Sequence, residues 1–176
     1  MSDLTESQAG WDHAAHEDAL FNILTEPGKE NGGWDDEEFF ARGETEIQTV
    51  LDRVGGLFTG RREALDFGCG VGRLTQALAG HFDTAHGVDI APEMIRKADY
   101  MAVRKNVEYH LNSTSDLSIF ETERFDFIYS RIALQHMPHH LQKGYVREFL
   151  RVLDSAGIAV FDVPDGPEFH HPNEWL

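Results

Sequence analysis

Up to about residue 60, apolar residues recur at the three- and four-residue spacing of amphipathic helices. This pattern predicts one helix over residues 12–24 and a second over residues 35–54. Asp35 or Asp36 is the expected N-cap of the second helix, because an aspartate there accepts backbone N–H bonds that the helix leaves unpaired. We therefore expect a helical N-terminal cap over residues 1–60.

From residue 61 onward, short apolar runs alternate with amphipathic stretches. The runs predict strands over residues 63–67, 85–90, 107–111, 125–130 and 157–163, and the stretches predict helices over residues 71–82, 92–104 and 138–154. Such alternation is typical of an α/β fold, a parallel sheet with helices on both faces. We expect a core over residues 61–163 and an irregular tail over 164–176, all within a single domain, 1–176.

Composition narrows the range of partners. The 176 residues carry a formal net charge of −16, which opposes binding to nucleic acid or to an anionic membrane surface, although solubility alone is the plainer reading of it. No apolar run approaches membrane-spanning length, and the polar start lacks the features of a signal peptide. The single cysteine, Cys69, suits a reducing compartment, so we expect a cytoplasmic protein.

Three glycines follow the first predicted strand of the core. In "ALDFGCGVGRLTQAL", Gly68, Gly70 and Gly72 come directly after Asp66, where a strand must turn into a helix. Glycine permits positive φ and lets a ligand approach the backbone closely. A dinucleotide pyrophosphate is one candidate ligand, but its motif has a longer last spacing. An acid at the strand end favours a cationic ligand instead.

A second acid, Asp89, ends the next predicted strand. Parallel strands end at one edge of a sheet, and ligands bind in the crevice there. A carboxylate at this place accepts bonds from both hydroxyls of a ribose. The alternative is that Asp89 only caps the helix that begins at Pro92.

At this point the chain resembles the class I S-adenosylmethionine-dependent methyltransferases. The resemblance rests on four segments, "LDFGCGVG", "GVDIAPEMI", "FDFIYSRIALQHM" and "FLRVLDSAGIAVFDV", in matching order over residues 62–163. It implies a Rossmann-like parallel sheet of about five strands in the order 3-2-1-4-5, S-adenosyl-L-methionine as cofactor, and methyl transfer as the activity. A nicotinamide oxidoreductase is disfavoured by the glycine spacing and by Asp66.

The resemblance also implies the cofactor-binding residues. Asp66 is expected near the amino group of the methionine part, with the glycine turn along it and Asp89 on the ribose. Cys69 is expected to be a small buried residue of the turn with no nucleophilic role. The expected set is Asp66, Gly68, Cys69, Gly70, Gly72, Asp89, Ile90, Met94, Asn112, Ser113, Thr114, Ser130 and Arg131.

His136 is the candidate general base, because it follows the fourth predicted strand and its usual pKa suits neutral pH. A histidine that only lines the pocket or bonds to the backbone is the alternative. No metal site is expected. The segment after the fourth strand lacks the paired prolines found in family members that methylate nucleic-acid or protein amide nitrogens. This absence favours a small-molecule or glycan-type acceptor.

The chain departs from the family pattern after the fifth strand. Strands six and seven of the family are absent, so the edge of the fifth strand needs a cover. A second copy or another partner, the N-terminal segment and the proline-rich tail are the candidates, unless the chain is part of a larger methyltransferase. A cofactor-binding module without catalysis is therefore the alternative function. In the N-terminal segment, Trp34, Phe39 and Phe40 are expected to line the cofactor site or to pack in the core.

Overall fold

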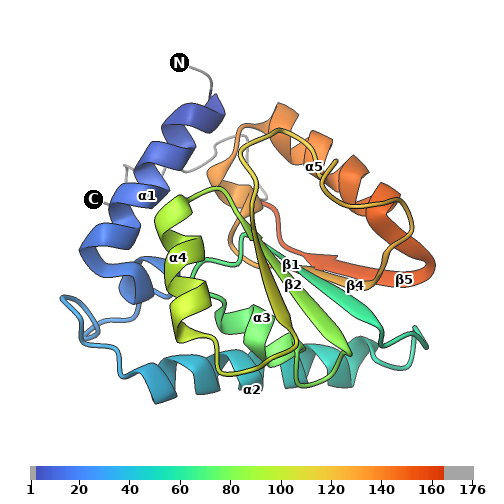
Figure 1. The fold of residues 1–176 in the computed structure, drawn as a ribbon, viewed down its shortest axis with the longest axis horizontal. Coiled ribbons are helices and arrows are strands. Elements are labelled where there is room, and N and C mark those ends of the chain that lie inside the picture. The colour runs from blue at the N-terminus through green and yellow to red at the C-terminus, as the bar shows by residue number, and fades with distance from the viewer. Residues whose placement is uncertain (1–2, 165–176) are drawn as a thin grey trace.

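The computed structural model describes residues 3–164 of the chain. Its helices are α1 (Asp3–Ile23), α2 (Asp36–Val54), α3 (Arg73–Leu78), α4 (Pro92–Met101) and α5 (His139–Val152), with a 3₁₀ turn, η1 (Leu134–His136). Its strands are β1 (Glu63–Phe67), β2 (Thr84–Asp89), β3 (Val107–Leu111), β4 (Phe125–Ser130) and β5 (Leu153–Phe161). The strand–helix alternation expected from the sequence is therefore confirmed (Figure 1).

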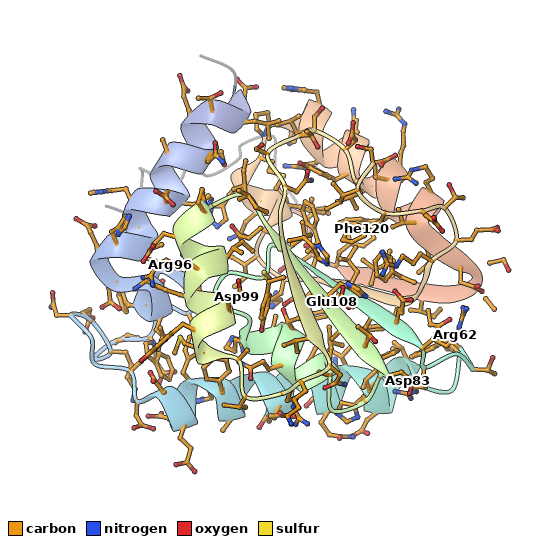
Figure 2. All side chains as sticks on the ribbon, in the orientation of Figure 1. Arg62, Asp83, Arg96, Asp99, Glu108 and Phe120 are labelled. Atoms are coloured by element: carbon orange, nitrogen blue, oxygen red, sulfur yellow. The ribbon has the colours of Figure 1, made fainter. Side chains whose placement is uncertain are left out.

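The five strands form one sheet in the order β3-β2-β1-β4-β5, and every neighbouring pair is parallel. This confirms the expected Rossmann-like order. The order reverses between β1 and β4, so a crevice opens beyond their carboxyl ends. The amino ends lie at the opposite edge, which Arg62 and Asp83 mark in Figure 2.

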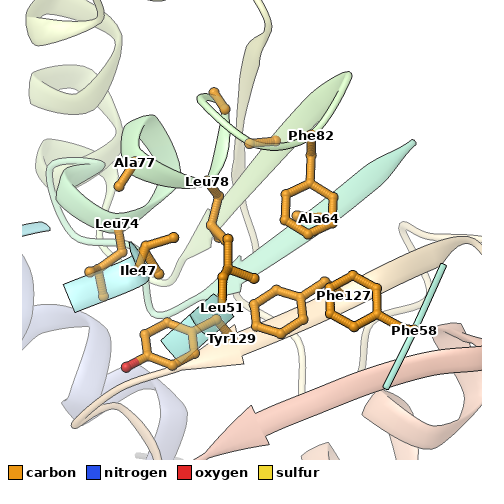
Figure 3. Packing of buried hydrophobic residues seen from close by; sticks show 12 residues of the cluster. Ile47, Leu51, Phe58, Ala64, Leu74, Ala77, Leu78, Phe82, Phe127 and Tyr129 are labelled. Atoms are coloured by element: carbon orange, nitrogen blue, oxygen red, sulfur yellow. The ribbon is translucent and has the colours of Figure 1, made fainter. Parts of the chain in front are cut away.

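Side-chain alternation along the strands builds a core on each face of the sheet. On one face, Phe127 of β4 packs with Ile47 and Leu51 of α2 (Figure 3). On the other, the next residue of β4, Ile128, packs with Phe149 of α5. Successive strand residues point to opposite faces, so a strand buried on both faces reads as a continuous apolar run. Helices α2 and α3 thus cover one face and α5 the other (Figure 1).

The largest differences from the sequence-based expectation concern α1, α3 and β5. Helix α1 begins at Asp3 and is kinked at Asp18, where φ is −154° and ψ is 81°. The Asp18 carboxylate accepts a bond from the backbone N–H of Gly32 at 2.8 Å, so a distant loop stabilises the kink. Helix α3 has only 6 residues. Strand β5 begins at Leu153, immediately after α5, because Leu153 already pairs with Phe125.

Other local expectations are met. Asp35 is the N-cap of α2 and accepts the N–H of Glu38 at 3.0 Å. Pro92 occupies the first turn of α4, where a proline loses no hydrogen bond. In the sheet order, β3 and β5 are the edge strands. The tail proposed as a cover for β5 lies almost wholly outside the described residues, and within residues 3–164 no helix combines the length and the apolar character that crossing a membrane requires.

Helices α2 and α3 approach each other through a glycine, and this contact generates a stability prediction. A Cβ atom on Gly43 would lie 2.7 Å from the backbone oxygen of Arg73, whereas one on Gly144 of α5 would meet only Ser115 O, at 3.8 Å. We expect Gly43→Ala to lower the free energy of unfolding by about 1–3 kcal/mol, the usual cost of overpacking. Gly144→Ala, the matched control, should raise it by up to about 1 kcal/mol, because alanine is the better helix former.

Urea denaturation of the two variants beside the wild type measures both effects. Equal changes in the two variants would contradict a close α2–α3 contact at Gly43.

Candidate active site

The turn between β1 and α3 can be built only with glycine. Gly68, Gly70 and Gly72 have φ values of +78°, +52° and +82°, in the left-handed region. A Cβ atom on Gly68 would lie 2.4 Å from Cβ of Ala133, and one on Gly70 would lie 2.5 Å from Cδ1 of Ile23. The backbone conformation therefore favours glycine at all three positions, and at Gly68 the Cβ atom of Ala133 also leaves no space for a side chain.

Asp89 joins this turn to the end of β2. Its Oδ2 accepts the N–H of Gly70 at 2.9 Å, and its Oδ1 accepts the N–H of Ala91 at 2.9 Å. Ala91 is the N-cap residue of α4, so the bond to Ala91 agrees with the alternative role of Asp89 as a helix cap. The bond to Gly70 is not part of that role. Each carboxylate oxygen retains a further acceptor position. Asp89 also lines a cavity, so it can serve the turn and a ligand together.

That cavity lies at the carboxyl ends of the strands and measures about 100 Å³. One wall is α1, through Ser7, Trp11, Asn22 and Ile23. The other walls are the glycine turn, the start of α4 and the segment after β4. The lining is largely apolar, with few polar groups, which is the composition of a small-molecule site.

The structure brings eight of the residues expected from the sequence together around this cavity. The lining residues among them are Gly68, Gly70, Asp89, Ile90, Met94, Asn112, Arg131 and His136. The other expected residues are not part of the lining; they are Asp66, Cys69, Gly72, Ser113, Thr114 and Ser130.

Asp66 lies behind the glycine turn. Its side chain is 1% exposed, and its Oδ2 accepts a bond from the hydroxyl of Thr75 at 2.7 Å. Burial raises the pKa of this carboxyl to about 7, with Glu46 and Asp89 contributing in the same direction and the Thr75 bond and the charge of Arg73 opposing the shift. Asp66 therefore changes charge near neutral pH, directly beneath the turn.

Of four further expected residues outside the lining, Ser130, Cys69 and Thr114 belong to the structure around the cavity, and Ser113 does not. The hydroxyl of Ser130 donates to the backbone oxygen of Phe67 at 3.0 Å and joins the ends of β4 and β1. Cys69 is buried, and burial raises the pKa of its thiol, which agrees with an unreactive turn residue. The hydroxyl of Thr114 donates to Oδ1 of Asn112 at 2.8 Å and orients that amide, while Ser113 is exposed.

Gly72 faces the sheet rather than the cavity. A Cβ atom on it would lie 2.1 Å from the hydroxyl oxygen of Tyr109 on β3. The Tyr109 ring thus occupies the space that a larger residue would need, and the turn stays tight against the sheet.

His136 lies in η1 and is 8% exposed. Its ring meets the Trp11 ring edge-on, with 5.0 Å between centroids. The side-chain amide of Gln135 lies 3.3 Å from Nε2 of His136. An amide nitrogen can only donate, so in this contact Nε2 is the ring nitrogen that carries the lone pair.

The backbone next to the cavity holds a strained residue. Ile132 has a φ of +63°, which a β-branched residue rarely adopts. Asp162, just after β5, accepts the N–H of Ile132 at 2.7 Å and pairs with Arg131. The end of the fifth strand therefore stabilises the conformation of a lining residue, and this role of Asp162 was not visible in the sequence.

The N-terminal segment covers the site through different aromatic residues from those singled out in the sequence. Trp34 and Phe39 are buried in a cluster with Met94, and Phe40 packs against that cluster, so the core interpretation describes them. Trp11 of α1 reaches the cavity instead, as does Tyr145 of α5. Only the docking of α1 beside α4 reveals the role of Trp11 (Figure 1).

Comparison with known proteins identifies the fold family. A methyltransferase domain family matches residues 64–157, more than half of the chain and the whole span from β1 into β5. The chain belongs to this methyltransferase family. The match includes the glycine turn, Asp89 and His136, so the candidate site lies within the part of the chain that the family shares.

Similarity to individual proteins is consistent with membership of this family. The chain is 30% identical over 113 residues to the ubiquinone biosynthesis O-methyltransferase of Xanthomonas oryzae pv. oryzae, covering 63% of this chain and 44% of that protein. The chain therefore spans less than half the length of this curated relative. The PH0226 protein of Pyrococcus horikoshii OT3 superposes with a TM-score of 0.63 at 28% identity, over 80% of this chain and 64% of that one.

A more distant structure supports the fold alone. Phosphoethanolamine N-methyltransferase 1 of Haemonchus contortus, solved with phosphoethanolamine and S-adenosylhomocysteine, superposes with a TM-score of 0.68 at 14% identity. The superposition covers 92% of this chain and 33% of that one, so it includes most of the N-terminal helices as well as the sheet.

The raised pKa of Asp66 generates a prediction for stability. The carboxyl titrates near pH 4 when the chain is unfolded and near pH 7 when it is folded, so between these values the folded state binds more protons. Stability contributed by Asp66 therefore falls as pH rises from about 4 to about 7. Relative to Asp66→Asn, we expect the wild type to lose on the order of a few kcal/mol of unfolding free energy over this range.

Urea denaturation at several pH values measures this difference for the two proteins, which share all other titrating groups. Parallel profiles from pH 4 to pH 8 would show that Asp66 keeps an ordinary pKa.

Proposed function

We propose that this chain binds S-adenosyl-L-methionine and transfers its methyl group to a small-molecule or glycan-type acceptor. The observation that carries the proposal is the position of Asp89, which holds the glycine turn by one oxygen and lines an apolar cavity at the point where strand order reverses. Membership of the methyltransferase family supports the same activity.

The residues present fit this cofactor. Asp89 offers acceptors for the ribose hydroxyls, Ile90 and Met94 offer apolar surface for the adenine, and the buried Asn112 supplies a polar group beside it. Gly68 and Gly70 line the cavity, and without side chains they let the methionine part approach the backbone of the turn closely. When bound, the cofactor supplies a methyl group on a positively charged sulfur.

The chain itself has mainly to position the acceptor and exclude water. Displacement at an activated carbon gains most from alignment of the reacting atoms. Trp11 and Ile23 of α1 line the cavity and supply apolar surface that helps to exclude water. Ionised Asp66, beneath the turn, favours a cationic ligand there.

His136 is the proposed general base. It lines the cavity, and Nε2 carries the lone pair that takes a proton from an acceptor hydroxyl. A hydroxyl acceptor is supported by the name of the Xanthomonas relative, which is an O-methyltransferase. The net charge of −16 supports a substrate other than nucleic acid.

A second candidate is a cofactor-binding module that lacks catalysis of its own. The match to the curated relative covers 44% of that protein, and acceptor contacts can lie in the part that is not matched. We also propose a cytoplasmic location, supported by the single buried cysteine, and a partner or a second copy of the chain along the edge of β5.

Binding of the cofactor is the first test. We expect isothermal titration calorimetry to detect S-adenosylmethionine binding and no binding of NADH. Asp89→Ala should weaken the affinity at least about tenfold, or 1.4 kcal/mol, because it removes the ribose acceptor. Asp83→Ala is the control, since Asp83 is exposed at the amino end of β2, far from α1 (Figure 2). Unchanged affinity in a folded Asp89→Ala protein would contradict the ribose assignment.

Catalysis is the second test, measured with radiolabelled methyl groups and a panel of hydroxylated small molecules. We expect His136→Ala to lower turnover by about 10²-fold or more, the usual contribution of a general base, while changing cofactor affinity much less. His140→Ala is the control, because His140 is exposed on α5. Equal loss of turnover and affinity would indicate a structural histidine, and binding without transfer to any acceptor would favour the non-catalytic module.

A further inference from the structure

Two histidines and a glutamate meet on the face of the sheet that α5 covers. Glu108 and His110 are two residues apart on β3, so their side chains point to the same face. His86 of β2 is the register partner of Glu108, and His110 is the partner of Val88. Parallel pairing of β2 and β3 therefore places all three side chains together at an edge of the sheet.

The ligand atoms of this cluster are spaced as a metal requires. Nδ1 of His86 lies 3.1 Å from Nε2 of His110 and 3.5 Å from Oε2 of Glu108, and the last two atoms are 4.0 Å apart. A tetrahedral zinc ion with bonds of about 2.0–2.2 Å needs ligand atoms about 3.3–3.6 Å apart. Shifts of a few tenths of an ångström would bring the three atoms to that geometry.

The ring nitrogen of His86 that points away from the cluster, Nε2, lies beside a carboxylate, as it does in most metal-binding histidines. This nitrogen lies 3.1 Å from Oε2 of Glu63, and that carboxylate is held by Nε of Arg124 at 2.6 Å. In the tautomer with the proton on Nε2, His86 donates to Glu63 and leaves the lone pair of Nδ1 for a metal; Nη2 of Arg124 also lies 3.3 Å from Nε2. A carboxylate behind the histidine is the common arrangement in zinc sites.

Packing fixes the rings and leaves one side open. Phe120 meets both the His86 and the His110 ring edge-on, at 6.0 and 5.1 Å between centroids. The His86 side chain is 1% exposed, that of His110 29% and that of Glu108 58%. Figure 2 shows Glu108 on β3 and Phe120 on the side of α5. The cluster is therefore reached by solvent through Glu108 and His110, while His86 is buried.

We propose that His86, Glu108 and His110 form a binding site for a divalent transition-metal ion of the zinc type, with water as the fourth ligand. Imidazole nitrogen and carboxylate oxygen form a donor set that suits zinc. The site links the edge strand β3 to β2 and stabilises the fold. It is separate from the cavity, because none of the three residues belongs to the cavity lining, so it does not depend on the proposed function.

The test uses the full chain without a histidine tag, freed of metal by a chelator. We expect calorimetry with Zn²⁺ to show one site per chain and a raised unfolding temperature, and Co²⁺ to give the visible absorption of a tetrahedral site. His110→Gln and Glu108→Gln should each weaken Zn²⁺ binding about tenfold or more and abolish the thermal shift. Both residues are partly exposed on an edge strand, so these variants should fold even if His86→Gln does not.

His16→Gln is the matched control. His16 is exposed on α1 beside Asp12 and Glu93, so it represents weak surface binding by a histidine near carboxylates. It should leave Zn²⁺ affinity unchanged. The proposal is overturned if the folded wild type binds no Zn²⁺, if both β3 variants bind as the wild type does, or if His16→Gln loses as much affinity as they do.

Discussion

The bonds that Asp89 makes with two backbone N–H groups hold the candidate site together. One bond fixes Gly70 in the turn after β1, and the other fixes Ala91 at the start of α4, so a single carboxylate sets the distance between two neighbouring crossovers. Burial raises the pKa of Asp89, which the backbone bonds partly offset. The turn and the cavity wall therefore depend on a charged group that is costly to bury and is tolerated because its bonds are well placed.

Much of the fold could be predicted from residue patterns because each element carries a local signal. The largely apolar run of β4, the proline that opens α4 and the glycines after β1 are each a local signal of the conformation adopted there. Boundaries were less accurate where contacts distant in sequence decide them. Strand β5 starts early because Leu153 pairs with Phe125, and α1 kinks where Asp18 binds Gly32.

In the candidate sites too, local sequence signals could be predicted and contacts between distant segments could not. The motif residues Gly70 and Asp89 could be predicted to lie together because parallel strands end at a common edge. Trp11 and Tyr145 could not, since only helix docking brings them to the cavity. The proximity of His86 and His110 could not be predicted from their spacing along the chain, because it arises from the register between β2 and β3.

The contacts that hold helix α1 in place affect how a ligand can enter the cavity. The helix is pinned to the start of α4 by Gln8, which donates to Ile90 O, and by Asp12, which accepts the N–H of Glu93, while Ile23 sits against Gly70. The enclosed space of about 100 Å³ is well below the 300–1,000 Å³ usual for a drug-sized molecule. A ligand as large as the proposed cofactor would need more space than this, which movement of α1 away from α4 about the kink at Asp18 would provide. The rate of association would then depend on how often α1 opens, and the contacts of Gln8 and Asp12 would slow release of the bound ligand.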